Sequence, residues 1–410
     1  MGRRWIPVLL ALFFVTTAIL QQQVSGNIDP LIIVDTHIDV PYRISRDYEN
    51  VGRPTQHGDF DYARARSGGL KAAFMSIFVP VERQLPGQAR HFADYLIDLV
   101  ELTCSYNPER FEIARSAADI RRIAGTNRVA LALGIENGAA IESELANLRH
   151  FYDRGVRYIT LAHGKANQIA DSSYDTERPW GGLSPFGKDV VREMNRLGII
   201  IDVSHISDAA VLDVLATTSV PVLASHSSAR ALTPGFERNL SDELIRQIAA
   251  AGGVIQVNFG SAFLTEEANR WYLRYLEAAT AYRSENGFSQ YAPVPEFERR
   301  YRARAPLPFA TLDDVLNHID HIVGLTGVEH VGFGSDFDGV GDSLPEGLKS
   351  VADYPALLDG LRERGYSEDE IRLIAGLNTL RVWRSAERFA KTQQLTDLRG
   401  DGRLLNGSMR

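Results

Sequence analysis

The strongest constraint on the fold is a repeat of eight apolar, β-branched runs along the 410-residue chain, nearly all followed by a helical pattern. Strands that are apolar throughout are typical of a parallel sheet that helices cover on both faces. Such a sheet needs a large core, which a chain of this length can build. The predicted strands span residues 31–39, 71–79, 128–137, 156–163, 198–205, 220–227, 252–259 and 329–339.

Eight strand–helix units predict an α/β fold, a closed (β/α)8 TIM-like barrel. An open doubly wound sheet is the alternative, but no glycine-rich phosphate loop follows the first strand. We expect a single barrel domain over residues 27–390, followed by a polar C-terminal tail over 391–410. The helical patterns lie near residues 88–104, 116–124, 141–153, 187–197, 207–216, 241–251, 311–325, 353–364 and 367–391.

The segment 264–310 interrupts this alternation between the seventh and eighth predicted strands. It is rich in charged and aromatic residues and shows no strand pattern, so we predict a partly helical insertion. Three roles are compatible with this composition: a lid over the barrel mouth, a surface for dimerisation, or a solvated helical excursion.

The N-terminal residues 1–26 have the layout of a secretory signal. Arg3 and Arg4 precede an apolar run over 6–20, and the small residues at 24–26 offer a cleavage site. The run is shorter than the roughly 20 residues that cross a bilayer. We therefore expect cleavage, no stable membrane anchor, and export to the periplasm or the medium; an uncleaved anchor is the alternative.

Charge and cysteine usage exclude some classes of protein. The net charge is −8 and the basic residues are scattered, which argues against a nucleic-acid partner. The single cysteine, Cys104, cannot form an intramolecular disulfide. Because it lies in an amphipathic, helical run, we expect it to be buried as a small apolar residue.

Ionisable residues stand at the ends of six predicted strands, where the active sites of such barrels are built. Four of the 10 histidines occupy these positions, and the other six fall in loops, helices or a strand start. One such residue alone is more often a hydrogen-bonded core residue, but the joint pattern predicts convergence on one mouth. The residues are His37, Asp39, Glu136, His163, His205, His226 and Asp336.

Imidazoles and carboxylates in one pocket predict a divalent metal site, with zinc favoured by ligand type. The donors outnumber what one zinc uses, so we expect two Zn²⁺ ions bridged by Glu136, with a hydroxide between them as nucleophile. Asp336 is expected to orient this nucleophile and pass its proton on, and His163 to donate to the oxyanion. Asp35 shares the strand face of His37, lies deeper, and is expected to support the ligands.

Seven segments, in order from Asp35 to Trp383, resemble the membrane (renal) dipeptidase family, the zinc dipeptidases of the amidohydrolase superfamily. Together they cover essentially the whole chain after the signal, and their combination is specific although no single segment is. The segments are VDTHIDVP, GIENG, LSPFGKDVVREMNRLGIIIDVSHIS, ASHSSARAL, FERNLSDELI, GFGSDFDG and AGLNTLRVW.

The resemblance implies a distorted (β/α)8 barrel with two zinc ions that hydrolyses dipeptides, L-D as well as L-L. His163 would contact the substrate at the scissile group, Arg238 would hold its terminal carboxylate, and Asp336 would bind substrate and transfer protons. Family resemblance also implies a homodimer. The metal ligands carried over are His37 and Asp39 for one ion, His205 and His226 for the other, and Glu136 as the bridge.

Two other functions are compatible with parts of the pattern. Another binuclear amidohydrolase, such as an N-acyl-amino-acid deacylase or a lactonase, would share the metal ligands but would not need Arg238. A non-catalytic binding protein of the export space predicts lost ligands, whereas every expected one is present. The loop after His163, GKANQIADSSYDTERPWGGLSPFG, is similar to that of bacterial members and leaves side-chain preference open.

Overall fold

The structure is a computed structural model that describes residues 31–290 and 292–400, with side chains described up to 396. The predicted signal over 1–26 lies outside the described residues. None of the helices in the described part of the chain is both long and apolar enough to cross a bilayer.

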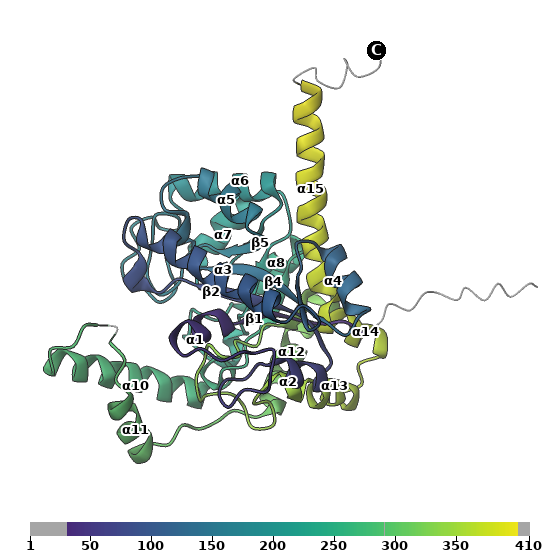
Figure 1. The fold of residues 1–410 in the computed structure, drawn as a ribbon. Helices are drawn as coiled ribbons and strands as arrows, with labels where there is room; N and C mark the ends of the chain where they lie inside the picture. The colour runs from purple at the N-terminus through teal and green to yellow at the C-terminus, as the bar shows by residue number, and fades with distance from the viewer. Residues whose placement is uncertain (1–30, 291, 401–410) are drawn as a thin grey trace, which may run out of the picture. The chain divides into compact units, whose positions relative to one another are not determined.

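The strands form one parallel sheet in the order β2-β1-β9-β8-β7-β6-β5-β4-β3, and β2 also pairs with β4. This second pairing closes eight strands into a ring, so the predicted (β/α)8 barrel is confirmed (Figure 1). The short β3 was not predicted; it pairs with the first residues of β4. The strands are β1 (Ile33–Ile38), β2 (Leu70–Phe78), β3 (Phe111–Ile113), β4 (Val129–Glu136), β5 (Val156–Thr160), β6 (Ile200–Asp202), β7 (Leu223–Ala224), β8 (Val254–Val257) and β9 (Val331–Phe333).

Several strands are shorter than predicted, so some of the ionisable residues predicted at strand ends lie in the loops that follow. His163, His205, His226 and Asp336 lie in the loops that directly follow β5, β6, β7 and β9. The backbone explains two of these early ends, because His205 has φ 69° and Asp336 has φ 64°. A left-handed residue cannot continue an extended strand, and such strain in residues other than glycine concentrates at functional sites.

Helices surround the barrel, and most match the predicted ranges. Two short helices between β1 and β2, α1 and α2, were not predicted. The last helix continues to Gly400, so the first part of the predicted tail is helical. The helices are α1 (Val40–Arg46), α2 (Tyr62–Ser67), α3 (Gln88–Tyr106), α4 (Ala117–Ala124), α5 (Ala146–Asp153), α6 (Pro185–Leu197), α7 (Asp208–Thr217), α8 (Asp242–Ala250), α9 (Ser261–Leu264), α10 (Glu266–Glu285), α11 (Pro295–Arg304), α12 (Leu312–Thr326), α13 (Tyr354–Glu363), α14 (Glu368–Arg372) and α15 (Asn378–Gly400).

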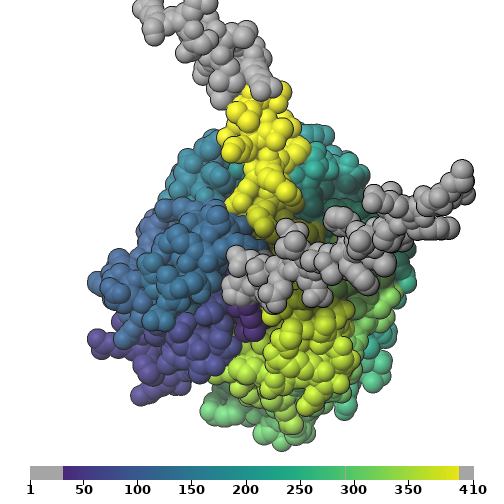
Figure 2. Space-filling view, turned by 90° about the vertical axis from the view of Figure 1, so that its right-hand side faces the viewer, coloured from purple at the N-terminus to yellow at the C-terminus, as the bar shows by residue number. Residues whose placement is uncertain are grey.

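Apolar residues form two main layers because successive strand side chains point to opposite faces. The inner layer fills the barrel and includes Val34, Phe74 and Trp383 of α15, whose ring centroid lies 5.2 Å from that of Phe74. The outer layer, which includes Ile33 and Leu131, packs against the surrounding helices. Beyond the barrel α15 stands out from the body (Figure 2). Burial of both layers away from water is the main force that holds the barrel together.

The predicted insertion begins at Leu264, the last residue of α9, and contains α10 and α11, so its partly helical character is confirmed. Aromatic rings join α10 to α11: Tyr282 and Phe297 stack with centroids 4.7 Å apart. Trp271 of α10 is buried and donates from Nε1 to the carbonyl of Ala305 at 2.8 Å. The predicted burial of Cys104 is only partly met, because this side chain on α3 is half-buried at the edge of the core.

Candidate metal centre

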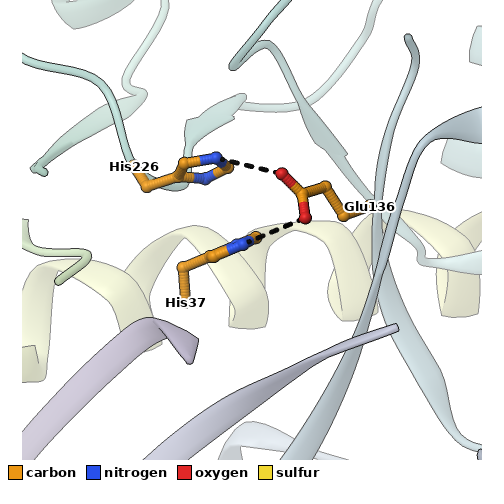
Figure 3. A group of neighbouring side chains, drawn as sticks. All are labelled: His37, Glu136 and His226. Atoms are coloured by element: carbon orange, nitrogen blue, oxygen red, sulfur yellow. Dashed lines mark ion pairs between the residues drawn. The ribbon is translucent and has the colours of Figure 1, made fainter. Parts of the chain in front are cut away.

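The carboxylate of Glu136 lies among four histidine side chains at the C-terminal end of the barrel. Its Oε1 lies 3.0 Å from Nε2 of His205, 3.3 Å from Nε2 of His163 and 3.4 Å from Nε2 of His226. Its Oε2 lies 3.4 Å from Nε2 of His37 (Figure 3). The two carboxylate oxygens therefore face different imidazoles, which is the arrangement that a bridging ligand requires.

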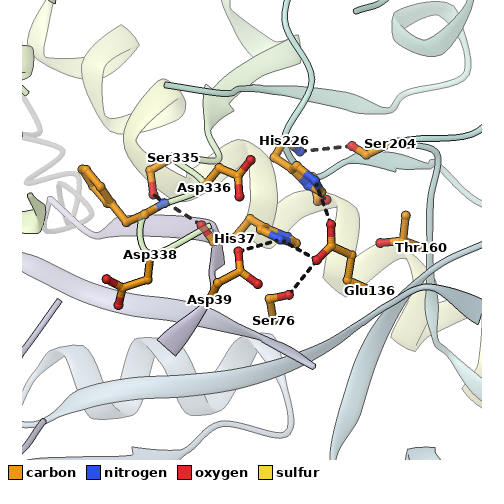
Figure 4. A network of polar contacts seen from close by, with 12 residues as sticks. His37, Asp39, Ser76, Glu136, Thr160, Ser204, His226, Ser335, Asp336 and Asp338 are labelled. Carbon is orange, nitrogen blue, oxygen red and sulfur yellow. Dashed lines mark hydrogen bonds and ion pairs between the residues drawn. The ribbon is translucent and has the colours of Figure 1, made fainter. Parts of the chain in front are cut away.

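The remaining carboxylates extend this group on the side of β1. Asp39 Oδ2 lies 3.4 Å from Nε2 of His37 (Figure 4). The ligand atoms of His37, Asp39 and Asp336 all lie within 4.8 Å of one another. Two further groups meet the same limit: His37 with Glu136 and His226, and Glu136 with His163 and His205. All seven residues predicted from the strand ends thus come together.

The chemistry of the donor set fits a divalent metal. Apart from the part-exposed His163, each of the seven residues is buried, and His37 is completely so. Nε2 of His37 has no hydrogen-bond partner among the described residues. Burial lowers the pKa of His205 and of His226 well below the ordinary value for histidine. Buried neutral imidazoles facing carboxylates are costly to desolvate unless an ion occupies the space between them.

A chain of hydrogen bonds behind His226 fixes the orientation of its ring. Ser225 Oγ donates to Asp202 Oδ2 at 2.6 Å and lies 2.6 Å from Nδ1 of His226. Because the serine hydroxyl already donates to Asp202, it accepts from a protonated Nδ1, which leaves the lone pair of Nε2 directed at the site. Asp202 also accepts from the backbone N–H groups of Ser204 and Ser225.

Asp202 was missed by the sequence reasoning. The signal that points to it is its place in the strand ahead of His205, as Asp35 stands ahead of His37. Buried carboxylates in folded proteins are nearly always hydrogen-bonded. An aspartate at the end of an apolar strand therefore indicates a hydrogen-bond network around it.

Two residues of the barrel interior form hydrogen bonds with His37 and Glu136. Tyr158 places its hydroxyl 2.8 Å from Nδ1 of His37, and Ser76 donates to Glu136 Oε2 at 3.1 Å. Gly134 makes room for the tyrosine, because a Cβ at that position would lie 2.0 Å from Cζ of Tyr158. The glycine is therefore required for the tyrosine to reach His37.

The prediction that Asp35 shares the face of His37 is wrong. The register of β1 against β2 shifts between Asp35 and Ile38, which breaks the alternation of side chains. Asp35 instead faces the outer layer, where it accepts from the hydroxyls of Ser335 and Tyr354, both at 2.5 Å. It also accepts from the backbone N–H groups of His37 and Ser335. Asp35 thus connects the end of β1 to the loop that carries Asp336. It supports the site from the face of β1 opposite to the one that was predicted.

Asp336 lies in the loop after β9 and accepts from Asn258 Nδ2 at 2.7 Å. Burial, together with the neighbouring charges of Asp39 and Glu136, raises the pKa of Asp336 to about 7. Glu136 behaves differently: burial raises its pKa, but His37 and His163 outweigh this effect and hold it well below the ordinary value. Like charges in one buried site separate the pKa values of its carboxyl groups in this way.

Arg238 lies beside the centre and is 2% exposed. Its Nη1 donates to Ser227 Oγ and its Nη2 to the carbonyl of His226, both at 2.8 Å. A guanidinium has five N–H donors, so three remain, and its Nε has no partner among the described residues. The residue is thus fixed by the loop that carries His226 and retains donors for an anionic group.

A parallel barrel with buried histidines and carboxylates at the C-terminal ends of its strands has the site expected of a metal-dependent hydrolase. The model of the membrane dipeptidase family, peptidase family M19, matches residues 22–397. The chain belongs to this family, which makes it a metallo-dipeptidase.

Individual relatives agree with this assignment. An uncharacterized dipeptidase of Schizosaccharomyces pombe is 34% identical over 371 residues, which cover 87% of this chain and 81% of the relative. The structure of the probable dipeptidase PvdM from Pseudomonas aeruginosa superposes with a TM-score of 0.76 at 30% identity, covering 88% of this chain and 96% of that one. A metallo peptidase from Rhodobacter sphaeroides, liganded with a phosphinate mimic of the dipeptide L-Ala-D-Ala, gives a TM-score of 0.71 at 25% identity, covering 87% and 99%.

Proposed function

We propose that the protein hydrolyses dipeptides with a free C-terminal carboxylate, with two zinc ions as its metal. The observation that carries this proposal is Arg238, a buried guanidinium with unused donors beside the group of metal-ligand residues. A buried arginine with free N–H groups matches a carboxylate, because the planar fork binds both of its oxygens.

Five residues would hold the ions. Zinc bound there supplies a Lewis acid for the peptide carbonyl and an activated water at neutral pH. Two ions are proposed because the donors form overlapping groups that share Glu136, whose two oxygens face different histidines. The residues are His37 and Asp39 for one ion, His205 and His226 for the other, and Glu136 between them.

The proposed roles of the other residues follow from their positions. Asp336, held by Asn258, accepts a proton from the attacking water and passes it to the leaving amine. His163 is part-exposed, with 22% of its side chain accessible, and so is open to substrate. It donates a hydrogen bond to the carbonyl oxygen as negative charge develops there. Arg238 orients the substrate by its terminal carboxylate and so reduces the entropy lost at the reacting centre.

We also propose that dipeptides with a D-residue at the C-terminus are accepted. The support is the similarity to the Rhodobacter sphaeroides structure, which holds a mimic of L-Ala-D-Ala. The test is a panel of L-L and L-D dipeptides with zinc measured on the same preparations. Turnover of L-L members alone would contradict this part, and full activity with fewer than two zinc equivalents would contradict the bridged site.

Arg238 provides the decisive experiment. We expect Arg238→Ala to raise KM at least about tenfold, because a hydrogen-bonded charge pair contributes about 1.5–3 kcal/mol. Amidation of the substrate's C-terminus should have the same effect on the wild type and little further effect on the variant. An exposed arginine such as Arg299, on α11, gives the matched control as Arg299→Ala.

A different result would favour the alternative amidohydrolase. A lactone has no free carboxylate to pair with Arg238. An N-acyl-amino acid keeps that carboxylate and lacks only the free amino group, so the Arg238 variant separates the dipeptidase from a lactonase but not from a deacylase. Unchanged KM in Arg238→Ala together with full activity on amidated substrates would therefore overturn the role proposed for Arg238 and favour substrates without a free carboxylate, as a lactonase takes.

We further propose that the protein is exported to the periplasm or secreted after cleavage near residue 26, and that it acts as a homodimer on small dipeptides without a nucleic-acid partner. The signal-like composition of residues 1–26 supports export, and the net charge of −8 argues against a nucleic-acid partner. The homodimer is proposed from the family resemblance. The mass of the N-terminal peptide from the native host tests cleavage, and light scattering tests the dimer. A retained N-terminus or a monomer at micromolar concentration would contradict them.

A further inference from the structure

An aromatic wall stands beside the metal centre on the side of Arg238. Its base is formed by Phe236, Ala262 and Phe263, and the rings of Phe236 and Phe263 lie 5.6 Å apart. The guanidinium carbon of Arg238 lies 5.3 Å from the ring centroid of Phe263. The wall therefore begins where a substrate carboxylate would be held.

Two tyrosines complete the wall. Tyr174, from the loop after His163, packs on Phe236 with ring centroids 6.1 Å apart, and its ring lies 5.8 Å from that of His205. Tyr272 comes from α10 and packs against the same base. The wall thus extends from Arg238 to one of the metal-ligand residues, and the insertion supplies part of it.

Tyr272 also lies near charged groups of the site. Burial raises the pKa of Tyr272 to about 12; Tyr275 and Asp336 add to this rise and Arg238 opposes it. Both Asp336 and Arg238 therefore lie within electrostatic reach of this hydroxyl. Neither Tyr174 nor Tyr272 has a hydrogen bond from its hydroxyl to another side chain in the described part of the chain. Tyr174 and Tyr272 are both half-buried against this cluster. A tyrosine that packs its ring in this way commonly uses its hydroxyl for a hydrogen bond, so a ligand group is the natural partner here.

Tyr272 is held in place by contacts at the start of the insertion. Thr265 caps α10 by accepting from the N–H of Ala268, and Asn269 donates to the carbonyl of Ala262 at 3.0 Å. Trp271, next to Tyr272, is buried and anchored at Ala305. A side chain fixed in this way loses little entropy when a ligand binds.

We propose that Tyr272 and Tyr174 recognise the C-terminal residue of the substrate. Tyr272 donates to its carboxylate beside Arg238, and the wall of Phe236, Phe263 and Tyr174 holds its side chain. The substrates are then dipeptides whose C-terminal side chain is apolar. This inference rests on the proposed dipeptidase function and gives the insertion a role in substrate recognition.

The test compares Tyr272→Phe with Tyr282→Phe, a tyrosine of the same helix that packs on Phe297 of α11 instead. Tyr272→Phe should raise KM about tenfold for dipeptides with a free carboxylate and leave kcat within about twofold, because one hydrogen bond to a charged group is lost. Tyr282→Phe should leave both constants unchanged. Calorimetry with a non-hydrolysable phosphinate dipeptide should show the same loss of affinity.

The side-chain preference has its own comparison. The wild type should favour leucine over aspartate or lysine at the C-terminal position at least about tenfold in kcat/KM, since an apolar wall favours burial of leucine and disfavours desolvation of a charged side chain. Tyr174→Ala should reduce this preference, whereas Tyr174→Phe, which keeps the ring, should retain it. Zinc content should be unchanged in both variants.

The outcomes distinguish failure of the inference about the tyrosines from failure of the proposed dipeptidase function. A wild type that hydrolyses no dipeptide would remove the proposed function and the inference with it. If dipeptides are hydrolysed but Tyr272→Phe behaves as Tyr282→Phe does, or if charged C-terminal residues are preferred, only the inference fails. Loss of zinc from Tyr174→Phe would also overturn it, since the ring would then act through the metal centre.

Discussion

At the scale of single residues, two of the three histidines proposed as metal ligands are oriented by a neighbour that the ion would not touch. His37 and His226 each have their Nδ1 engaged, by Tyr158 and by Ser225, which leaves Nε2 for the centre. Behind Ser225 stands Asp202, which is completely buried. This carboxylate therefore determines the direction in which the serine hydroxyl donates and, through it, the tautomer of His226.

Asp202→Asn should weaken zinc binding about 10- to 100-fold, the usual effect of losing a group that orients a ligand. The asparagine amide can donate to Ser225 instead of accepting from it, which reverses the hydrogen bonds along the chain. Competition with a chromophoric chelator measures the change, and Asp359→Asn at an exposed position is the control. Equal zinc affinity in the two variants, with Asp202→Asn folded by circular dichroism, would show that this chain of bonds does not orient His226.

Residue identity could be predicted from the sequence better than residue direction. The seven residues that meet at the candidate metal centre could be picked out because each follows an apolar run and because their motifs resemble a known family. The face of β1 on which the Asp35 side chain lies could not be predicted, because the register shift in β1 depends on pairing with β2 and leaves no local signal in the sequence. The positive φ of His205 and Asp336 likewise depends on the surrounding loops. Tyr272 gave no signal, since a tyrosine in a charged helix normally faces solvent.

At the scale of elements, α12 joins two segments that border the centre. His318 of α12 is buried, accepts at Nδ1 from the N–H of Ala229 at 3.0 Å, and lies 2.9 Å at Nε2 from the carbonyl of Leu264. Ala229 lies in the loop that carries His226, and Leu264 ends α9 at the start of the insertion. Both bonds exist together only when the imidazole is neutral, because protonated Nδ1 cannot accept.

His318 therefore makes the fold sensitive to acid. Burial lowers the pKa of His318 to about 4, with His321 lowering it further while the bond to Leu264 and Asp314 oppose the shift. The unfolded chain has an ordinary value near 6.5, so it binds more protons than the folded state between these values. The contribution of neutral His318 to the stability of the folded state is therefore complete above about pH 6.5 and is lost as the pH falls towards 4.

Between pH 7.5 and 5.0 this group should remove about 2 kcal/mol from the free energy of unfolding. Urea unfolding of the wild type and of His318→Gln at both pH values measures the effect. The variant, whose amide offers an acceptor and a donor without titrating, should lose about 2 kcal/mol less than the wild type over this range. The same pH dependence in both proteins would show that His318 is not the group responsible.

At the scale of the whole molecule, the barrel brings residues from across the chain into one buried site. His37 and Asp336 come from opposite ends of the barrel sequence and meet because β1 and β9 are neighbours. Burial raises the pKa of Asp39 and of Asp336, and the negative charge of Glu136 adds to both shifts. Closure of the barrel thus forces carboxylates together at a free-energy cost that a bound cation offsets.

Removal of the metal should therefore lower the stability of the entire barrel. A ligand at 1,000 times its Kd stabilises the folded state by about 4 kcal/mol, and a domain larger than 250 residues shifts its Tm by about 2 °C or less per kcal/mol. We expect dialysis against a chelator to lower the Tm measurably, by up to about 8 °C, and added zinc to restore it. In His226→Ala, which retains fewer donors, the same treatment should produce a smaller shift. An identical Tm with and without chelator, with loss of zinc shown by elemental analysis, would mean that the carboxylates of the site are tolerated without a cation.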